Sequence, residues 1–242
     1  KDDIVLEIGP GKGVLTEKLL ELAGKVIAIE KDVELIQLLR EKFSKELEAG
    51  RLEILPKDIL KFDLEILREY KKPYKLIANI PYYITGAIIE QFLGASYQPS
   101  RMVLLIQKEV AERIIARDQL SGNLGGKQSI LSIAVGAYGT PKIISKVPAG
   151  AFFPPPKVDS AIISIENISR NFFGGASEQK FFEVVKYCFG RKRKQLLSSL
   201  TEYLEDRTKA LSVLQKSDIP EKARPETLSK EDWKRLVTHT YE

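Results

Sequence analysis

The sequence predicts an α/β fold in which an open, mainly parallel sheet with helices on both faces is followed by a small helical domain. Short apolar runs alternate with helical patterns through most of the chain, which is typical of a parallel sheet built from βα units. Residues 167–177 are rich in Asn, Ser and Gly, and the sequence after them has helical periodicity. We therefore expect one domain at 1–170 and a second at 171–242.

Strands are expected where short apolar runs lie between turn residues. These runs are Ile4–Ile8, Val26–Ile29, Leu52–Leu55, Leu76–Ala78 and Met102–Ile106, and helices are expected at 14–23, 33–48, 64–70, 84–93, 109–117 and 129–137. Two later strands, at 142–147 and 158–165, flank a proline-rich loop and are expected to form an antiparallel edge pair. A last helix should begin after Ser229, because Ser229 and Asp232 have the spacing of a capping box.

Composition argues against several classes of site. Cys188 is the only cysteine and His239 the only histidine, so we expect neither an internal disulfide framework nor a metal site. No run approaches the roughly 20 apolar residues of a membrane span, and we expect a cytoplasmic protein without a membrane partner. The formal charge of +5 suits a polyanionic partner but does not require one.

A glycine-rich turn, Glu7-Ile8-Gly9-Pro10-Gly11-Lys12-Gly13, follows the first expected strand. Position 14 is Val where a dinucleotide fingerprint needs Gly, and Lys12 is followed by Gly where a P-loop needs Ser or Thr. Neither phosphate motif fits. The glycines would instead allow close approach of a nucleoside with an amino-acid part, as in S-adenosylmethionine. A tight strand-to-helix connection without a ligand is the alternative.

Acidic residues follow the next two expected strands. Glu30 ends the second strand, with Lys31 after it, and its carboxylate can accept hydrogen bonds from ribose hydroxyls. Asp58, followed by Ile59, comes after the third strand and can accept from an adenine amine. Each alone is equally an ordinary charge or turn residue. Because the carboxyl ends of parallel strands form the ligand crevice, their shared position predicts one cofactor site.

The stretch Asn79-Ile80-Pro81-Tyr82 follows the fourth expected strand and predicts chemistry on an exocyclic amine such as adenine N6. The N6 lone pair is delocalised into the ring, and two hydrogen-bond acceptors can pull the nitrogen toward tetrahedral geometry. The Asn79 side-chain oxygen and a backbone carbonyl near Ile80 can serve as these acceptors. Pro81 stiffens the turn, and Tyr82 offers a ring on which a base can stack. An ordinary strand exit is the alternative.

These motifs resemble those of the rRNA adenine N6,N6-dimethyltransferase family, with the erythromycin-resistance methyltransferases as cousins. The resemblance covers nearly the whole chain and rests on residues 5–13, 79–82, 107–111 and the aromatic-proline stretch 152–160. It implies a Rossmann-like class I methyltransferase fold with S-adenosylmethionine as cofactor. The cofactor contacts that it implies are Glu7, Gly9, Gly11, Gly13, Glu30, Lys31, Asp58, Ile59 and Asn79. The catalytic residues are Asn79, Ile80, Pro81, Tyr82 and Phe152, with Phe152 packing near the flipped base.

The same resemblance implies small-subunit rRNA in an immature 30S particle as partner of a monomeric enzyme, with two adjacent adenosines near the 3′ end as target. Arg191-Lys192-Arg193-Lys194 are candidates for RNA binding, and a solvated basic turn is the alternative. Methylation of large-subunit rRNA, methylation of DNA and a non-catalytic RNA-binding assembly or transcription factor are the other functions to weigh. The Tyr82-Tyr83 pair and residues 224–229 resemble the small-subunit group more closely.

Members of this family carry an N-terminal Gly-Gln-x-Phe-Leu-type stretch that closes over the cofactor, and this chain begins downstream of it at Lys1. We therefore expect cofactor binding by this chain to be weakened or absent. Calorimetric titration with S-adenosylmethionine measures it directly, and an ordinary micromolar affinity would contradict the expectation.

Overall fold

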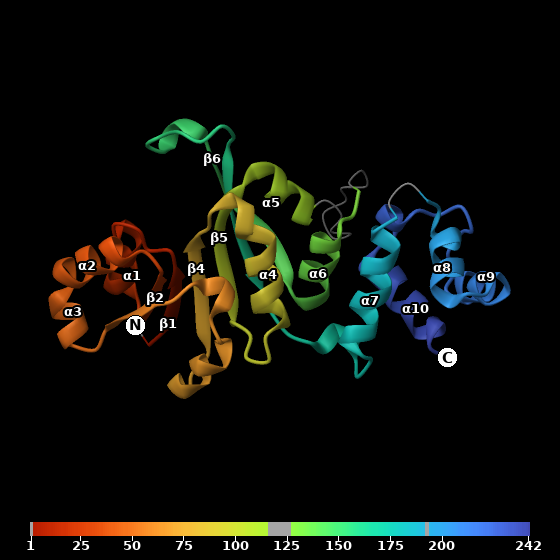
Figure 1. Cartoon of the computed structure of the whole chain (residues 1–242), viewed down its shortest axis with the longest axis horizontal. Coiled ribbons are helices and arrows are strands. Elements are labelled where there is room, and N and C mark those ends of the chain that lie inside the picture. Colours follow the sequence, from red (N-terminus) through yellow and green to blue (C-terminus); the bar gives the residue numbers. More distant parts are fainter. Residues whose placement is uncertain (1, 116–126, 192–193) are drawn as a thin grey trace. The chain divides into compact units, whose positions relative to one another are not determined.

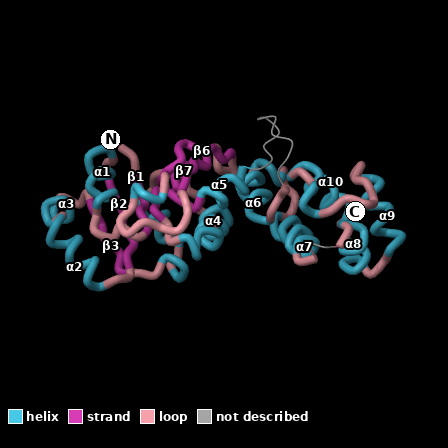
Figure 2. Tube along the Cα trace, turned by 90° about the horizontal axis from the view of Figure 1, so that it is seen from above, coloured by secondary structure: helices cyan, strands magenta, loops and turns pink. Residues whose placement is uncertain are grey.

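The computed structural model describes residues 2–115, 127–191 and 194–242, which divide into two compact units. The first unit contains the described parts of Lys1–Ala111 and Gly139–Ile168, and the second those of Glu112–Tyr138 and Ser169–Glu242. Every described strand belongs to the first unit, whereas the second is helical (Figure 2).

The division at Ile168 and Ser169 lies close to the boundary predicted from the composition break. The structure differs from the prediction in grouping the described residues 112–115 and 127–138 with the helical unit. A packing contact explains this grouping. The Tyr138 ring lies 5.4 Å from the Phe173 ring and 5.7 Å from the Phe182 ring, centroid to centroid. A segment that precedes the last two strands in sequence thus supplies core to the helical unit.

Among the described residues the first unit forms a seven-stranded sheet in the order β3-β2-β1-β4-β5-β7-β6 (Figure 1). Strands β1 to β5 run parallel, and β7 pairs antiparallel with both β5 and β6. The antiparallel pair predicted from sequence is confirmed, with β6 at the edge. The strands are β1 Ile4–Ile8, β2 Lys25–Glu30, β3 Leu52–Pro56, β4 Tyr74–Asn79, β5 Arg101–Gln107, β6 Thr140–Val147 and β7 Ser160–Glu166.

The helices follow the predicted pattern with two differences. They are α1 Val14–Leu22, α2 Val33–Lys42, α3 Ser44–Glu48, α4 Thr85–Gly94, α5 Lys108–Ile115, α6 Ile130–Tyr138, α7 Glu178–Phe189, α8 Leu196–Leu204, α9 Arg207–Lys216 and α10 Lys230–Thr240. The single helix predicted at 33–48 is broken at Phe43, whose backbone leaves the helical region while its ring enters the core. The segment Leu64–Tyr70 is a 3-10 helix rather than an α-helix. The capping box predicted at Ser229 and Asp232 is confirmed.

The strand order reverses between β1 and β4, and this reversal positions the candidate site. Crossovers between parallel strands are right-handed, so α1 and α2 cover one face of the sheet and α4 covers the other. Alternate residues of the central strands are buried on both sides, as Val5 and Leu6 illustrate. The loops after β1 and β4 leave the sheet in opposite directions and open a crevice between their carboxyl ends.

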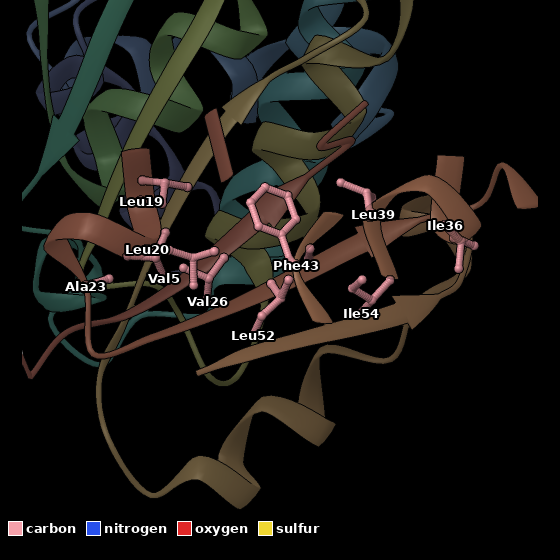
Figure 3. Close-up of a cluster of buried hydrophobic side chains, with 11 residues drawn as sticks. Val5, Leu19, Leu20, Ala23, Val26, Ile36, Leu39, Phe43, Leu52 and Ile54 are labelled. Carbon is pink, nitrogen blue, oxygen red and sulfur yellow. The ribbon is translucent and has the colours of Figure 1, made fainter. Parts of the chain in front are cut away.

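The face under α1 and α2 is filled by a cluster of apolar side chains (Figure 3). The strands contribute Val5, Val26, Ala28, Leu52 and Ile54, α1 contributes Leu19 and Leu20, and α2 with the residue after it contributes Ile36, Leu39 and Phe43. Gly13, at the N-cap of α1, lies against this cluster with φ +76°. A Cβ there would lie 2.5 Å from Phe43 Cε2 and 2.8 Å from Leu39 Cδ2. The core therefore requires a residue without a side chain at position 13.

We predict that Gly13→Ala lowers the free energy of unfolding by about 3 kcal/mol, because left-handed strain of about 1–2 kcal/mol adds to overpacking of about 1–3 kcal/mol. Gly50→Ala is the matched control, since Gly50 has φ +67° and a Cβ there would meet no atom within 4 Å. It should lose only the strain. Urea unfolding of both variants makes the comparison, and equal losses would show that Phe43 moves aside without cost.

Candidate active site

The structure brings the predicted cofactor residues to one edge of the sheet. The glycine turn follows β1, Glu30 ends β2, Asp58 follows β3 and Asn79 ends β4, so all of them lie at carboxyl ends of parallel strands. The register pairs Glu7 with Ala28 and with Ile77. Because side chains alternate between faces, Glu7, Glu30 and Asn79 project on the same face, the one that α1 covers.

The glycine turn has an open part and a packed part. Gly9 has φ +64° and Gly11 has φ +57°, and a Cβ at either position would meet no atom within 4 Å. The Gly9 N–H donates to the Ile29 carbonyl at 3.0 Å, which holds the turn against β2. Gly9 and Gly11 therefore expose backbone to free space that a ligand can occupy. Gly13 has a structural reason of its own, because the apolar cluster packs against it.

Glu30 is held in a fixed orientation by its own backbone neighbours. Its Oε1 accepts from the Lys31 N–H at 2.8 Å and from the Asp32 N–H at 3.1 Å. Asp32 in turn caps α2. The Glu30 side chain is buried. Among the described residues, its Oε2 is nevertheless not one of the fully buried oxygen atoms without a hydrogen-bond partner. An oriented carboxylate oxygen at the mouth of the crevice fits the predicted contact with ribose hydroxyls. The Lys31 side chain is exposed beside it.

Asp58 makes polar contacts, whereas the side chain of Ile59 packs in the core. Asp58 Oδ1 accepts from the Leu60 N–H at 3.1 Å and so caps the 3-10 helix Ile59–Lys61. Its Oδ2 accepts no hydrogen bond from the described residues and remains free for a ligand. The Ile59 side chain is buried, and its carbonyl accepts from Gln91 Nε2 at 3.0 Å. Ile59 thus fixes the backbone next to Asp58.

Glu7 is a buried carboxyl group without a full set of partners. The residue is 1% exposed, and its Oε2 has no hydrogen-bond partner in the described part of the chain. Burial raises the pKa of Glu7 to about 7, with a smaller opposing effect from the Thr16 hydroxyl. A buried acceptor without a donor is costly, and its position at the end of β1, next to the open glycines, suits a ligand that brings a donor.

The predicted target-base motif presents two free acceptors. Asn79 is exposed at the end of β4, and no described residue hydrogen-bonds to its side chain. The Ile80 side chain is buried and its N–H donates to the Leu105 carbonyl at 3.4 Å, but within the described residues no donor reaches the Ile80 carbonyl. The Pro81 carbonyl accepts from the Ile84 N–H at 3.1 Å and closes the turn. The strand ladder therefore ends at two acceptors that have no donor among the described residues.

Sequence reasoning missed two residues that support the target-base motif. The Tyr82 hydroxyl hydrogen-bonds to Ser160 Oγ at 2.7 Å, and Ser160 is fully buried at the start of β7. Asp159 Oδ1 accepts from the Ala149 N–H at 3.1 Å, and the Asp159 carbonyl accepts from the Lys108 N–H at 3.0 Å. These bonds tie the loop that carries Phe152 to the end of β5. The only sequence signal was that both residues close the aromatic-proline stretch.

The predicted RNA-binding run is only partly described, because Lys192 and Arg193 lie outside the described residues. Arg191 and Lys194 both form ion pairs with Glu202. The Arg191 guanidinium also lies over the Tyr187 ring, 4.0 Å from its centroid. Contact with phosphate at either residue would therefore compete with an existing partner.

No group of three or more His, Cys, Asp or Glu side chains in residues 2–115, 127–191 and 194–242 is placed to hold a metal ion. The helices of the same residues are all too short or too polar to cross a membrane.

Comparison with known proteins adds relatives of named activity. The model of the family described as "Ribosomal RNA adenine dimethylase" matches residues 1–240. A "Ribosomal RNA small subunit methyltransferase A" from Dehalococcoides mccartyi is 44% identical over 235 residues, which are 97% of this chain and 77% of the relative. A protein of the same name from Clostridium botulinum is 38% identical over 242 residues, which are 100% of this chain and 85% of the relative.

Solved structures of two related proteins share the fold. A dimethyladenosine transferase from Plasmodium falciparum is 30% identical with a TM-score of 0.76, covering 97% of this chain and 88% of that one. The 23S rRNA methyltransferase ErmE is 27% identical with a TM-score of 0.73, covering 100% of this chain and 92% of that one. The predicted α/β methyltransferase fold is thereby confirmed.

Glu7 generates a prediction on pH-dependent stability. A carboxyl group whose pKa is raised in the folded state stabilises the fold at low pH and loses that contribution as pH rises through its folded pKa. The pKa of Glu7 rises from the ordinary carboxyl value of 4.5 to about 7, so the loss for Glu7 is roughly 3 kcal/mol. We therefore predict that Glu7→Gln, which stays neutral, removes this part of the decline between about pH 4 and pH 7.

Urea unfolding of wild type and Glu7→Gln at pH 5 and pH 8 tests this. The difference between the two proteins cancels the other titrating groups. Parallel pH profiles would show that the Glu7 carboxylate is not desolvated in the folded state.

Proposed function

The chain belongs to the ribosomal RNA adenine dimethylase family, and on that premise we propose that it transfers methyl groups from S-adenosylmethionine to N6 of two adjacent adenosines in the 3′-terminal hairpin of 16S rRNA. The observation that carries the mechanism is the pair of free acceptors, Asn79 Oδ1 and the Ile80 carbonyl, at the end of β4. Relatives named for the small subunit at 38–44% identity favour this substrate over the 23S rRNA named for ErmE at 27%.

The residues at the crevice fit the cofactor in chemical kind. S-adenosylmethionine supplies an electrophilic methyl group on a sulfonium. The open backbone at Gly9 and Gly11 accepts its bulk, Glu30 can accept from the ribose hydroxyls, and Asp58 Oδ2 can accept from the adenine amine. The unpartnered Glu7 Oε2 adds a buried acceptor next to the open glycines. Lys31 lies exposed at the rim.

The chain's own part in the reaction is positioning and hydrogen bonding. Asn79 Oδ1 and the Ile80 carbonyl would accept the two N6 hydrogens and localise the nitrogen lone pair toward the methyl carbon. The bond from that carbon to the cofactor's sulfur would break as the bond to nitrogen forms, and the sulfur would leave as a neutral thioether. The nitrogen becomes cationic on attack and strongly acidic, so its proton can leave to water afterwards. After the first transfer one hydrogen remains, and one acceptor loses its donor before the second transfer.

The target base must leave its stack to reach these acceptors, which costs a few kcal/mol. Stacking on the Tyr82 ring, held by Ser160, offsets part of this cost, and Phe152 closes the pocket from the loop that Asp159 anchors. Pro81 stiffens the turn that carries Tyr82. In this proposal Arg191 and Lys194 give up their ion pairs with Glu202 and contact RNA phosphate instead. Lys192 and Arg193 complete the basic run.

We further propose that the protein acts as a monomer in the cytoplasm on immature 30S particles. The relatives from Dehalococcoides mccartyi and Clostridium botulinum are bacterial proteins named for the small-subunit RNA, and bacterial ribosomal subunits assemble in the cytoplasm. The net charge of +5 favours association with this polyanion.

Asn79→Ala should lower kcat for methyl transfer about 100-fold or more, because it removes one hydrogen-bond acceptor that stabilises the charge developing on nitrogen. Immature 30S particles and 50S precursors are incubated with the full-length protein and labelled S-adenosylmethionine, and modified bases are mapped. Asn171→Ala, an exposed change in the helical unit, is the matched control. Label confined to large-subunit RNA would overturn the substrate assignment, and no label with wild-type protein would favour a non-catalytic assembly factor.

A further inference from the structure

Two aromatic rings next to the predicted base pocket face solvent. Tyr83 is 82% exposed although it directly follows Tyr82, which is half-buried and bonded to Ser160. Phe153 is 100% exposed although it directly follows the half-buried Phe152. In each motif one ring is half-buried and its neighbour is exposed. Large apolar rings with this exposure contribute nothing to the core.

Both exposed rings are anchored at the same end of the sheet. Tyr83 lies in the 3-10 helix Tyr82–Ile84 after β4, and Phe153 lies in the connection from β6 to β7, which extends beyond the end of β6 (Figure 1). The bond from Tyr82 to Ser160 and the bonds of Asp159 to Ala149 and Lys108 connect these segments. The segments that carry the two rings are therefore both tied to the edge of the sheet formed by the ends of β4 and β5.

The loop that carries Phe153 is stiff and is flanked by positive charge. Three consecutive prolines, 154–156, follow Phe153 and reduce the entropy that a contact would cost. Lys157 is exposed and forms no ion pair within the described residues, and Lys108 follows β5 at the same edge. Exposed aromatic rings beside lysines are the combination with which proteins bind unpaired nucleotides.

We propose that Tyr83 and Phe153 are stacking platforms for the nucleotides that flank the target adenosine. This inference rests on the proposed function. Tyr82 and Phe152 enclose the base that reacts. The exposed rings of Tyr83 and Phe153 stack on the neighbouring bases and keep them unstacked from the rest of the RNA. The second of two adjacent adenosines therefore stays bound near the site while the first is methylated. Lys157 neutralises phosphate beside Phe153.

The contacts of these rings persist from the bound state to the transition state, so their loss weakens RNA binding without slowing chemistry. Phe153→Ala and Tyr83→Ala should each raise the KM for RNA about tenfold, which corresponds to about 1.4 kcal/mol, and leave kcat within about twofold. Phe153→Leu keeps an apolar side chain without a stacking face and should lose as much as Phe153→Ala, whereas Phe153→Trp should retain binding.

The direct readout uses an RNA hairpin with 2-aminopurine in place of the nucleotide next to the target adenosine. Wild-type protein should quench its fluorescence through ring stacking, and Phe153→Ala or Tyr83→Ala should reduce the quench. Leu22→Ala is the matched control, because Leu22 is 72% exposed at the end of α1, at the opposite edge of the sheet. It should change neither KM nor fluorescence.

Two outcomes would overturn the inference while the proposed function stands. In the first, wild type methylates RNA and both alanine variants match it in KM and in quenching. In the second, the variants fail only on assembled 30S particles and bind the hairpin like wild type, which would assign the rings to a ribosomal protein. Wild-type protein that transfers no methyl group to any RNA would instead contradict the proposed function itself.

Discussion

The reversal of strand order between β1 and β4 is the constraint on which the site depends. Parallel strands send their carboxyl ends to one edge, and the right-handed crossovers diverge at that reversal. Residues as distant in sequence as Gly9 and Asn79 thus meet at one crevice, because β1 and β4 pair with Ile8 beside Ala78. The antiparallel strand β7 also reaches this edge. Its first residue, Ser160, pairs with Gln107 at the carboxyl end of β5 and brings the aromatic-proline loop there.

Polar groups at this edge are satisfied selectively. The bonds that orient the site are made: Glu30 Oε1 is held by two backbone N–H groups, and the Tyr82 hydroxyl is held by Ser160. The acceptors that a substrate or cofactor would use are left without donors in the described chain, as at Glu7 Oε2 and the Ile80 carbonyl. Unpaired acceptors cost stability, and at a site for donor-bearing ligands that cost is recovered when the ligand binds.

Local patterns predicted the strands, most helices and the order of motifs, because apolar runs and turn residues report burial directly. They did not predict the break at Phe43, where a ring that completes the core outweighed helical continuity. They also did not predict that residues 127–138 group with the helical unit, which depends on rings far away in sequence. Within the site, the glycine turn looked uniform. Only the structure separates Gly13, against which Phe43 packs, from Gly9 and Gly11, which face open space.

The two pairs of neighbouring aromatic residues show why sequence alone could not tell half-buried rings from exposed ones. Tyr82 and Tyr83 are chemically identical, as are Phe152 and Phe153, and no local pattern states which ring turns inward. The Tyr82 ring is held by a hydrogen bond to Ser160 on β7, and the segment that carries Phe152 is held by the bonds of Asp159 to Ala149 and Lys108. Neither Ser160 nor Asp159 carries a reacting group. A target pocket assembled in this way depends on the β5 and β7 pairing as much as on its own side chains. A substitution at Ser160 therefore acts by changing the orientation of the Tyr82 ring. It does not change the charge of the site.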